Sequence, residues 1–279
     1  MQEESTRYTG VPNWSDFRAL RRSQTLRILE EYSNEFLRAN ASVTNLYKWS
    51  LDPLHHWSRL WEYPYCWRIL RAYSAGRTVR ILDAGCGWTF FPYFLSAKLP
   101  RSTVVGCDSD SNLSQLFNYS NARMRCTVDF DVESLEELAY PDASFDVVYC
   151  ISVLEHLRER NKALGELKRV LRKGGLLLLT YDISPDGLSD IPIAEARQLL
   201  ERLQKEFSPV GNYSLRLIST QKGILGRFPM RTPSELFATC VRFVNRDIRW
   251  DHLVSSFGLT FHRRGFQGKT IFAGAFLRD

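Results

Sequence analysis

The sequence predicts an α/β fold in which one large domain is preceded by a helical segment. Its 279 residues, 44% of them hydrophobic, can bury one large core but leave little room for two full domains. Residues 79–89 form a short apolar run that stops at an acid and two glycines, which predicts a buried strand entering a tight turn. Residues 14–39 carry apolar side chains at helical spacing, which predicts an amphipathic helix before that strand.

The segment between this helix and the first strand is rich in aromatic side chains. Residues 45–75 hold four of the seven tryptophans. Ordinary core packing explains most clusters of this kind. The alternative is an aromatic lid over a ligand, where ring faces favour a cation and exclude water, with residues 61–64 as its contact.

The turn after the first strand predicts the charge of its ligand. Gly85 and Gly87 allow backbone conformations that other residues avoid, and they let a ligand lie against bare main chain. Asp83, at the end of the strand, would repel a pyrophosphate, so the ligand should present a cation or a hydroxyl. Thr89 is a good cap for a helix that begins at Phe90.

Strands and helices follow one another along the rest of the chain. Apolar runs predict further strands at residues 103–108, 126–132, 145–151, 176–181, within 208–218, and at 270–277. Asp108, which ends the first of these, either accepts the ribose hydroxyls of a nucleoside or caps the next helix. The helix before the strand at 176–181 is expected to close at Gly174, and another helix is patterned over 192–203.

Two motifs resemble those of class I S-adenosylmethionine-dependent methyltransferases, in the pattern called methyltransferase type 11. The Asp-x-Gly-x-Gly run at 83–87 resembles their motif I, although Thr89 stands where the family often has a third glycine. The Phe-Asp-x-Val run at 145–148, followed by Leu-Glu-His at 154–156, resembles the motif after the fourth strand in many small-molecule methyltransferases.

The resemblance implies a Rossmann-like fold with a seven-stranded, mostly parallel sheet, helices on both faces and an N-terminal helical cap. The cap would be residues 1–78, and the S-adenosylmethionine-binding methyltransferase domain residues 79–279. An insertion at about 219–269 interrupts the expected ending. We expect this insertion and the aromatic segment to form one wall of the acceptor site. In the family, the final strand pairs antiparallel beside the sixth.

The resemblance also implies a cofactor, S-adenosylmethionine, whose product is S-adenosylhomocysteine. The residues expected to bind it follow the ends of the first four strands: Asp83, Ala84, Gly85, Gly87, Asp108, Ser109, Asp131, Val132 and Ile151. In the family an aspartate after the third strand meets the adenine amino group. Asp131 is preferred for that role, and Asp129 competes for it.

Two residues after the fourth strand are candidates for catalysis. His156 is expected to act as general base, because imidazole titrates near neutral pH, although a buried helix-capping histidine is an equal alternative. Glu155 precedes it. Some family branches bind magnesium through Glu-x-x-Glu-His, but Ser152 occupies the first position here, so we assign no metal.

These motifs predict methyl transfer to a small-molecule acceptor, with oxygen as the expected acceptor atom. The alternatives are a nucleic-acid or protein methyltransferase, or a non-catalytic S-adenosylmethionine-binding protein. The net charge of +6 would suit nucleic acid, but the fourth strand is not followed by the Asn/Asp-Pro-Pro-Tyr pattern of base amino methylases. The sequence shows neither a signal peptide nor a run long enough to span a membrane, so we expect a cytoplasmic protein. Its oligomeric state is left open.

Overall fold

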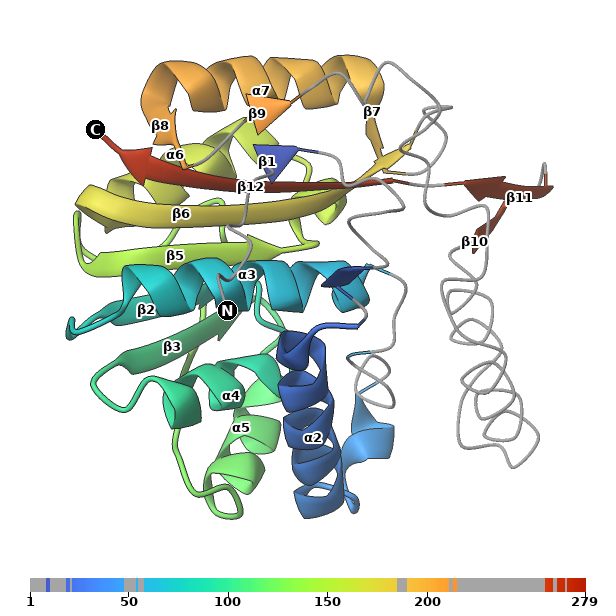
Figure 1. Cartoon of the computed structure of the whole chain (residues 1–279), viewed down its shortest axis with the longest axis vertical. Coiled ribbons are helices and arrows are strands. Elements are labelled where there is room, and N and C mark those ends of the chain that lie inside the picture. Colours follow the sequence, from blue (N-terminus) through green and yellow to red (C-terminus); the bar gives the residue numbers. More distant parts are fainter. Residues whose placement is uncertain are drawn as a thin grey trace.

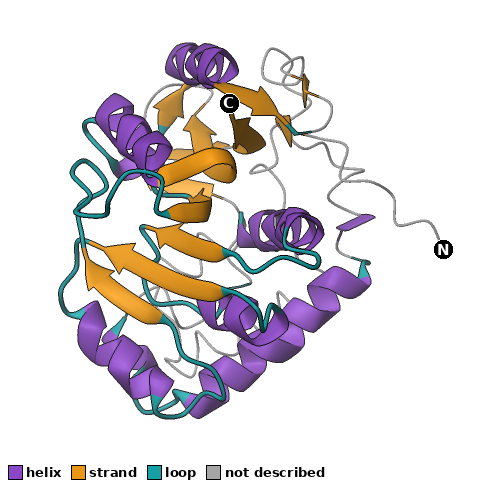
Figure 2. Cartoon of the chain, turned by 90° about the vertical axis from the view of Figure 1, so that its left-hand side faces the viewer, coloured by secondary structure: helices purple, strands orange, loops and turns teal. Residues whose placement is uncertain are grey.

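The chain forms a twisted sheet with helices packed on both faces (Figure 1, Figure 2). This computed structural model describes residues 9–10, 19–20, 22–47, 54, 58–184, 190–210, 213–214, 259–262, 265–268 and 270–279. Most of the expected insertion at 219–269 therefore lies outside the described residues, as do His55 and His56.

The centre of the sheet consists of β2 (Arg80–Ala84), β3 (Thr103–Asp108), β4 (Asp129–Val132), β5 (Phe145–Ile151), β6 (Leu171–Ser184) and β12 (Thr270–Arg278). They lie in the order β4-β3-β2-β5-β6-β12. The pairs from β4 to β6 are parallel, and β12 is antiparallel to β6. This arrangement confirms the predicted fold class.

Short strands add to this sheet beside β6 and β12. They are β1 (Thr9–Gly10), β7 (Ile191–Pro192), β8 (Phe207–Pro209) and β9 (Tyr213–Ser214). β8 pairs antiparallel with β12, which is the pairing expected between the sixth and last strands, but it is shorter than the predicted run. β10 (Leu259–His262) and β11 (Gly265–Gly268), within the expected insertion, pair with each other.

The strand order creates a natural place for a ligand. From β2 the chain goes outward to β3 and β4, and then returns to the other side of β2 to form β5 and β6. Connections from the carboxyl ends of β2 and β5 therefore leave in opposite directions. In open sheets of this kind, ligands bind in the crevice at that point.

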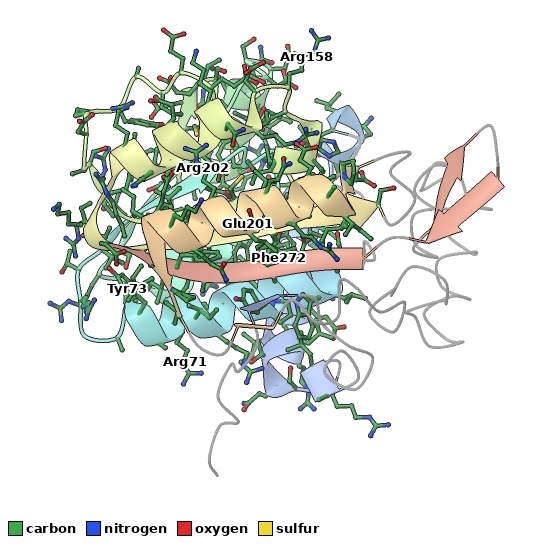
Figure 3. The ribbon with its side chains drawn as sticks, turned by 90° about the horizontal axis from the view of Figure 1, so that it is seen from above. Arg71, Tyr73, Arg158, Glu201, Arg202 and Phe272 are labelled. Carbon is green, nitrogen blue, oxygen red and sulfur yellow. The ribbon has the colours of Figure 1, made fainter. Side chains whose placement is uncertain are left out.

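The helices bury the two faces of the sheet in two separate cores. α2 (Gln24–Ala39), α3 (Arg59–Tyr73), α4 (Phe91–Lys98) and α5 (Leu113–Asn121) share one core, while α6 (Arg160–Val170) and α7 (Ile193–Glu206) share the other. In Figure 3, α7 runs alongside β12 near Phe272, which belongs to the second core. None of the described helices combines the length and apolar character needed to cross a membrane.

The N-terminal helices α2 and α3 pack in the core on one face of the sheet. Ser23 caps α2 by accepting a hydrogen bond from the Leu26 N–H at 3.2 Å, and the helix buries Leu29 and Phe36. α3 buries residues all around its first two turns, which is typical of a helix covered on every side. The sequence-based prediction of an amphipathic helix is confirmed for the described part of residues 14–39.

One predicted helix ends earlier than expected. α6 stops at Val170, and Leu171 already pairs with Phe145 in the sheet. The register then shifts, so that Val147 lies opposite Leu176. Gly174 has a φ of 68° but lies in this irregularity and does not close the helix. The basic residues before it are exposed, because they lie in the part of β6 where the pairing with β5 is interrupted.

Candidate active site

The turn after β2 has the backbone that its glycines predict. Gly85 and Gly87 have φ values of 75° and 53°, a region that residues with a side chain rarely adopt. A Cβ atom on Gly85 would lie 2.7 Å from both methyl carbons of Val153, and one on Gly87 would collide with the Tyr47 hydroxyl. The carbonyl of Cys107 accepts from the Gly85 N–H at 2.8 Å, which ties the turn to β3.

Asp83 lies at the end of β2 with only 5% of its surface exposed. Burial raises its pKa to about 8, since a carboxylate loses its hydration there. The Tyr149 hydroxyl, across the β2–β5 pair, and the Arg59 guanidinium act in the opposite direction, while the carboxylate of Asp108 raises the pKa further. A cationic ligand would relieve the cost of ionising this group, as the sequence analysis expects.

We expect Asp83→Asn to stabilise the protein at alkaline pH when no ligand is present. The folded-state pKa of Asp83 lies above its unfolded value, so its contribution to stability is present below about pH 4 and is lost as the pH rises through about 8. The melting temperature of the variant should therefore exceed that of the parent at pH 9 and approach it at pH 4. An equal difference at both pH values would contradict a buried, titrating Asp83.

Asp108 connects the tip of β3 to the glycine turn. Its Oδ2 accepts from the Gly87 N–H at 3.0 Å, and its Oδ1 accepts from the Asp110 N–H at 3.1 Å. The helix-capping alternative is wrong, because α5 begins at Leu113 with Asn112 as its N-cap, and neither hydrogen bond of Asp108 reaches that helix. The nucleoside role stays a prediction, since each carboxylate oxygen can accept a second hydrogen bond. Ser109 follows directly and is exposed.

Asp131 and Val132 end β4 beside this acid. In the β3–β4 register, Asp131 lies opposite Cys107 and Val132 opposite Asp108, whereas Asp129 is two residues further from the tip. The Tyr140 hydroxyl donates to Asp131 at 2.7 Å. Val132 is 48% exposed, which is unusual for a large apolar side chain and fits a place where a flat ligand would cover it.

The carboxyl end of β5 completes the row of strand tips. Ala84 and Ile151 end β2 and β5, and both are buried. Ser152 follows Ile151 with a φ of 49°, an uncommon conformation for a serine. The 3₁₀ helix η2 (Leu154–His156) then places the Glu155 side chain in the interior, 6% exposed, and that of His156 at the surface.

A buried polar cluster connects this end of the sheet to α3. Glu62 is fully buried, and its Oε1 accepts from the hydroxyls of Ser152 at 2.7 Å and Thr180 at 2.6 Å. Its Oε2 forms an ion pair with the Arg59 guanidinium one helical turn earlier. Glu62 therefore holds Ser152 in its uncommon conformation. Val153, which follows Ser152, covers Gly85, so the cluster lies next to the glycine turn.

Most of the described aromatic rings of residues 45–75 pack in the core. Tyr63 stacks on Phe91 at a centroid distance of 4.6 Å, and Trp67 meets Phe94 edge-on at 4.8 Å. Of the residues expected to contact a ligand, Glu62 reaches the β5 tip through the polar cluster. Tyr47, whose hydroxyl lies against Gly87, is an aromatic residue of this segment that covers the turn. Two further tryptophans of this segment, Trp49 and Trp57, lie outside the described residues.

Sequence reasoning missed Arg59 and Thr180 of the polar cluster, and also Asp182, whose N–H donates to Oε1 of Glu155 at 3.3 Å. Two of them left a signal. Thr180 and Asp182 are polar residues two positions apart at the end of the leucine run of β6, so they share one face of the sheet. On that face the side chains change from apolar in the core to polar at the carboxyl end. For Arg59 the only signal in the sequence was its spacing of three residues from Glu62. The same spacing is common in ion pairs on the surface of helices.

Comparisons with known proteins agree with this geometry. Residues 82–179 match a family model described as a methyltransferase domain. The tRNA U34 carboxymethyltransferase of Helicobacter hepaticus is 29% identical over 147 residues, which cover 49% of this chain and 47% of that protein. The demethylmenaquinone methyltransferase of Deinococcus radiodurans is 31% identical over 110 residues, covering 39% and 46%. This chain thus spans less than half the length of either relative.

Solved structures share the fold. The MccD protein covers 77% of this chain and 97% of its own, with a TM-score of 0.53 and 13% identity. Phosphoethanolamine N-methyltransferase 2 of Haemonchus contortus, solved with phosphomonomethylethanolamine and S-adenosylhomocysteine, covers 76% of this chain and 52% of its own. Its TM-score is 0.50 and its identity 17%.

Proposed function

We propose that this chain is a class I S-adenosylmethionine-dependent methyltransferase that methylates a small molecule, since residues 82–179 match a methyltransferase domain model. The cofactor half of the site supports the proposal. The acceptor half lies at the ends of β5 and β6, beside residues of α3.

The observation that carries the proposal is the row of acids along three neighbouring strand tips. Asp83, Asp108 and Asp131 end β2, β3 and β4 around a turn that has no room for side chains on its glycines. Hydroxyls and amino groups of a nucleoside, and the positive charges of a sulfonium amino acid, are ligands that carboxylates accept. The exposed Val132 offers an apolar surface for a base.

The chain's own residues would orient and shield the reacting groups. S-adenosylmethionine, when bound, supplies a methyl group on a positively charged sulfur. We assign Asp83, Ala84, Gly85, Gly87 and Ile151 to its amino-acid half, and Asp108, Ser109, Asp131 and Val132 to its nucleoside half. Asp83 would lower the free energy of a nearby positive charge, and Tyr47 would exclude water from the glycine turn.

A proton acceptor is available next to the acceptor side. The sequence assigned this role to His156 and, with it, an oxygen acceptor. Because the His156 side chain is exposed whereas that of Glu155 is buried, we assign the role to Glu155. Burial raises the pKa of Glu155 to about 8, which suits proton transfer near neutral pH.

Calorimetry with S-adenosylhomocysteine tests the proposal. We expect binding with a dissociation constant on the order of micromolar, about −8 kcal/mol. NAD serves as the control because it shares the adenosine but adds a pyrophosphate, which Asp83 disfavours. Binding of NAD without binding of S-adenosylhomocysteine would refute the proposal.

A second candidate acceptor is RNA. The relative from Helicobacter hepaticus is named as a tRNA-modifying enzyme, and the net charge of +6 would suit a polyanion. Binding to bulk tRNA between about 50 and 200 mM salt distinguishes the two. An RNA-modifying protein should bind tRNA with an affinity that falls steeply with salt, whereas a small-molecule enzyme should show no measurable binding.

A further inference from the structure

Tyr140 reaches from the loop between β4 and β5 back to the end of β4. Its hydroxyl donates a hydrogen bond to Oδ2 of Asp131 at 2.7 Å. Its ring packs edge-on against Phe145, the first residue of β5, with the ring centroids 5.0 Å apart. Burial raises the pKa of Tyr140, and so does the neighbouring Asp131, so the hydroxyl keeps its proton and acts as the donor. The loop therefore supplies a hydrogen-bond donor to one of the three acids at the strand tips.

The loop is held on both sides of Tyr140 by Arg169 of α6. Its Nη2 donates to the Leu138 carbonyl and its Nη1 to the Tyr140 carbonyl, both at 2.8 Å. Its other donors pair with the carboxylates of Asp142 and Glu166, also at 2.8 Å. An arginine side chain has five N–H donors, and all five are used here. Because Glu166 also accepts from the Leu138 N–H at 2.9 Å, movement of the loop would break several charge-assisted hydrogen bonds.

The Tyr140 hydroxyl restricts the orientation of the Asp131 carboxylate. Rotation of that carboxylate would break the hydrogen bond to Oδ2, and Oδ1 is left to accept from a ligand. Val132, the next residue, offers the exposed apolar surface that we assigned to the base. A ligand group that meets Oδ1 must be a donor. In an adenine nucleoside, the donor that the base offers is its exocyclic amine.

We propose that Tyr140 is a positioning residue, which fixes the Asp131 carboxylate as the acceptor for the exocyclic amine of the cofactor's adenine. This inference rests on the proposed function and specifies how the nucleoside half of the site selects its base. A purine with a carbonyl in place of the amine would bring an oxygen against Oδ1 and leave the carboxylate without its donor. Sites built to hydrogen-bond an N–H group reject analogues that lack it for this reason.

Calorimetry with two matched ligands tests the proposal. S-inosylhomocysteine is S-adenosylhomocysteine with a carbonyl in place of the exocyclic amine. We expect the parent to bind S-adenosylhomocysteine at least about tenfold more tightly than S-inosylhomocysteine. Tyr140→Phe removes the hydroxyl and keeps the ring against Phe145, so the affinity for S-adenosylhomocysteine should fall about three- to tenfold while that for S-inosylhomocysteine is unchanged. A purely structural role would weaken both ligands alike.

Tyr73→Phe is the matched control, because it removes a hydroxyl that donates to the Gly174 carbonyl at 2.9 Å. Tyr73 is the last residue of α3 (Figure 3) and lies beside the amino end of β5, away from the strand tips. Both affinities should equal those of the parent. Asp131→Ala should abolish the preference for S-adenosylhomocysteine. Adding Tyr140→Phe to Asp131→Ala should change neither affinity further, because the hydroxyl acts through the carboxylate.

Four outcomes would overturn the role of Tyr140: equal affinity of the parent for the two ligands, unchanged affinities in Tyr140→Phe, an equal loss of both, or a further change when Tyr140→Phe is added to Asp131→Ala. Each leaves the proposed function standing, because the parent binds S-adenosylhomocysteine in every case. Failure of the parent to bind S-adenosylhomocysteine would instead refute the proposed function itself.

Discussion

Replacing Glu62 with alanine is expected to lower the free energy of unfolding by about 3–5 kcal/mol, the range for breaking a buried ion pair by removing one partner. The variant leaves Arg59 without its ion-pair partner and strips Ser152 and Thr180 of the oxygen to which they donate. Denaturant unfolding near neutral pH measures the loss. Alanine in place of the exposed Glu201 is the matched control and should change stability by no more than about 0.5 kcal/mol.

A double variant shows where the loss arises. Arg59→Met combined with Glu62→Leu removes both charges and keeps the volume apolar, so it should recover part of the stability lost in Glu62→Ala. Glu62→Gln should fall between them, since an amide oxygen can still accept from Ser152 or Thr180. A loss in Glu62→Ala no larger than that of the Glu201 control would show that the cluster does not hold α3 on the sheet.

The fold could be predicted from the sequence because its strongest signals are local. The strands at 103–108 and 145–151 have the predicted bounds. Turn residues on either side of an apolar run mark in the sequence where the strand begins and ends. The end of α6 could not be predicted in the same way. A basic pair followed by Gly174 is a common helix ending, but the pairing of Leu171 with Phe145 decides the boundary, and that contact is long-range.

The same difference between local signals and long-range contacts applies to the candidate site. Its cofactor half follows from motifs that each lie within a few residues, and β2, β3 and β4 bring them into one row. Its acceptor half depends on pairs far apart in sequence, such as Glu62 with Thr180, 118 residues apart. The relative burial of neighbouring Glu155 and His156 is likewise a property of the packed structure. A periodic pattern could not have separated them, because they are adjacent in a 3₁₀ helix of three residues.

Asp108→Ala is expected to weaken S-adenosylhomocysteine binding by about 1–3 kcal/mol, or about 5- to 150-fold. The carboxylate accepts from the N–H groups of Gly87 and Asp110, so its removal strands two donors as well as the ligand hydroxyls assigned to it. Asp110→Ala is the matched control, since its carboxylate caps Asn112 in the same exposed loop. Calorimetry gives the affinity, and unfolding without ligand gives the stability.

These two measurements separate a purely structural role of Asp108 from the predicted binding of the nucleoside. If the carboxylate only ties β3 to the glycine turn, Asp108→Ala lowers stability while the affinity of the folded protein equals that of Asp110→Ala. If it also binds the nucleoside, affinity falls further than in the control. Asp108→Asn then discriminates within the second case. Its amide keeps one acceptor oxygen for the Gly87 N–H but cannot accept two ligand hydroxyls as well, so stability should be largely restored while affinity stays low.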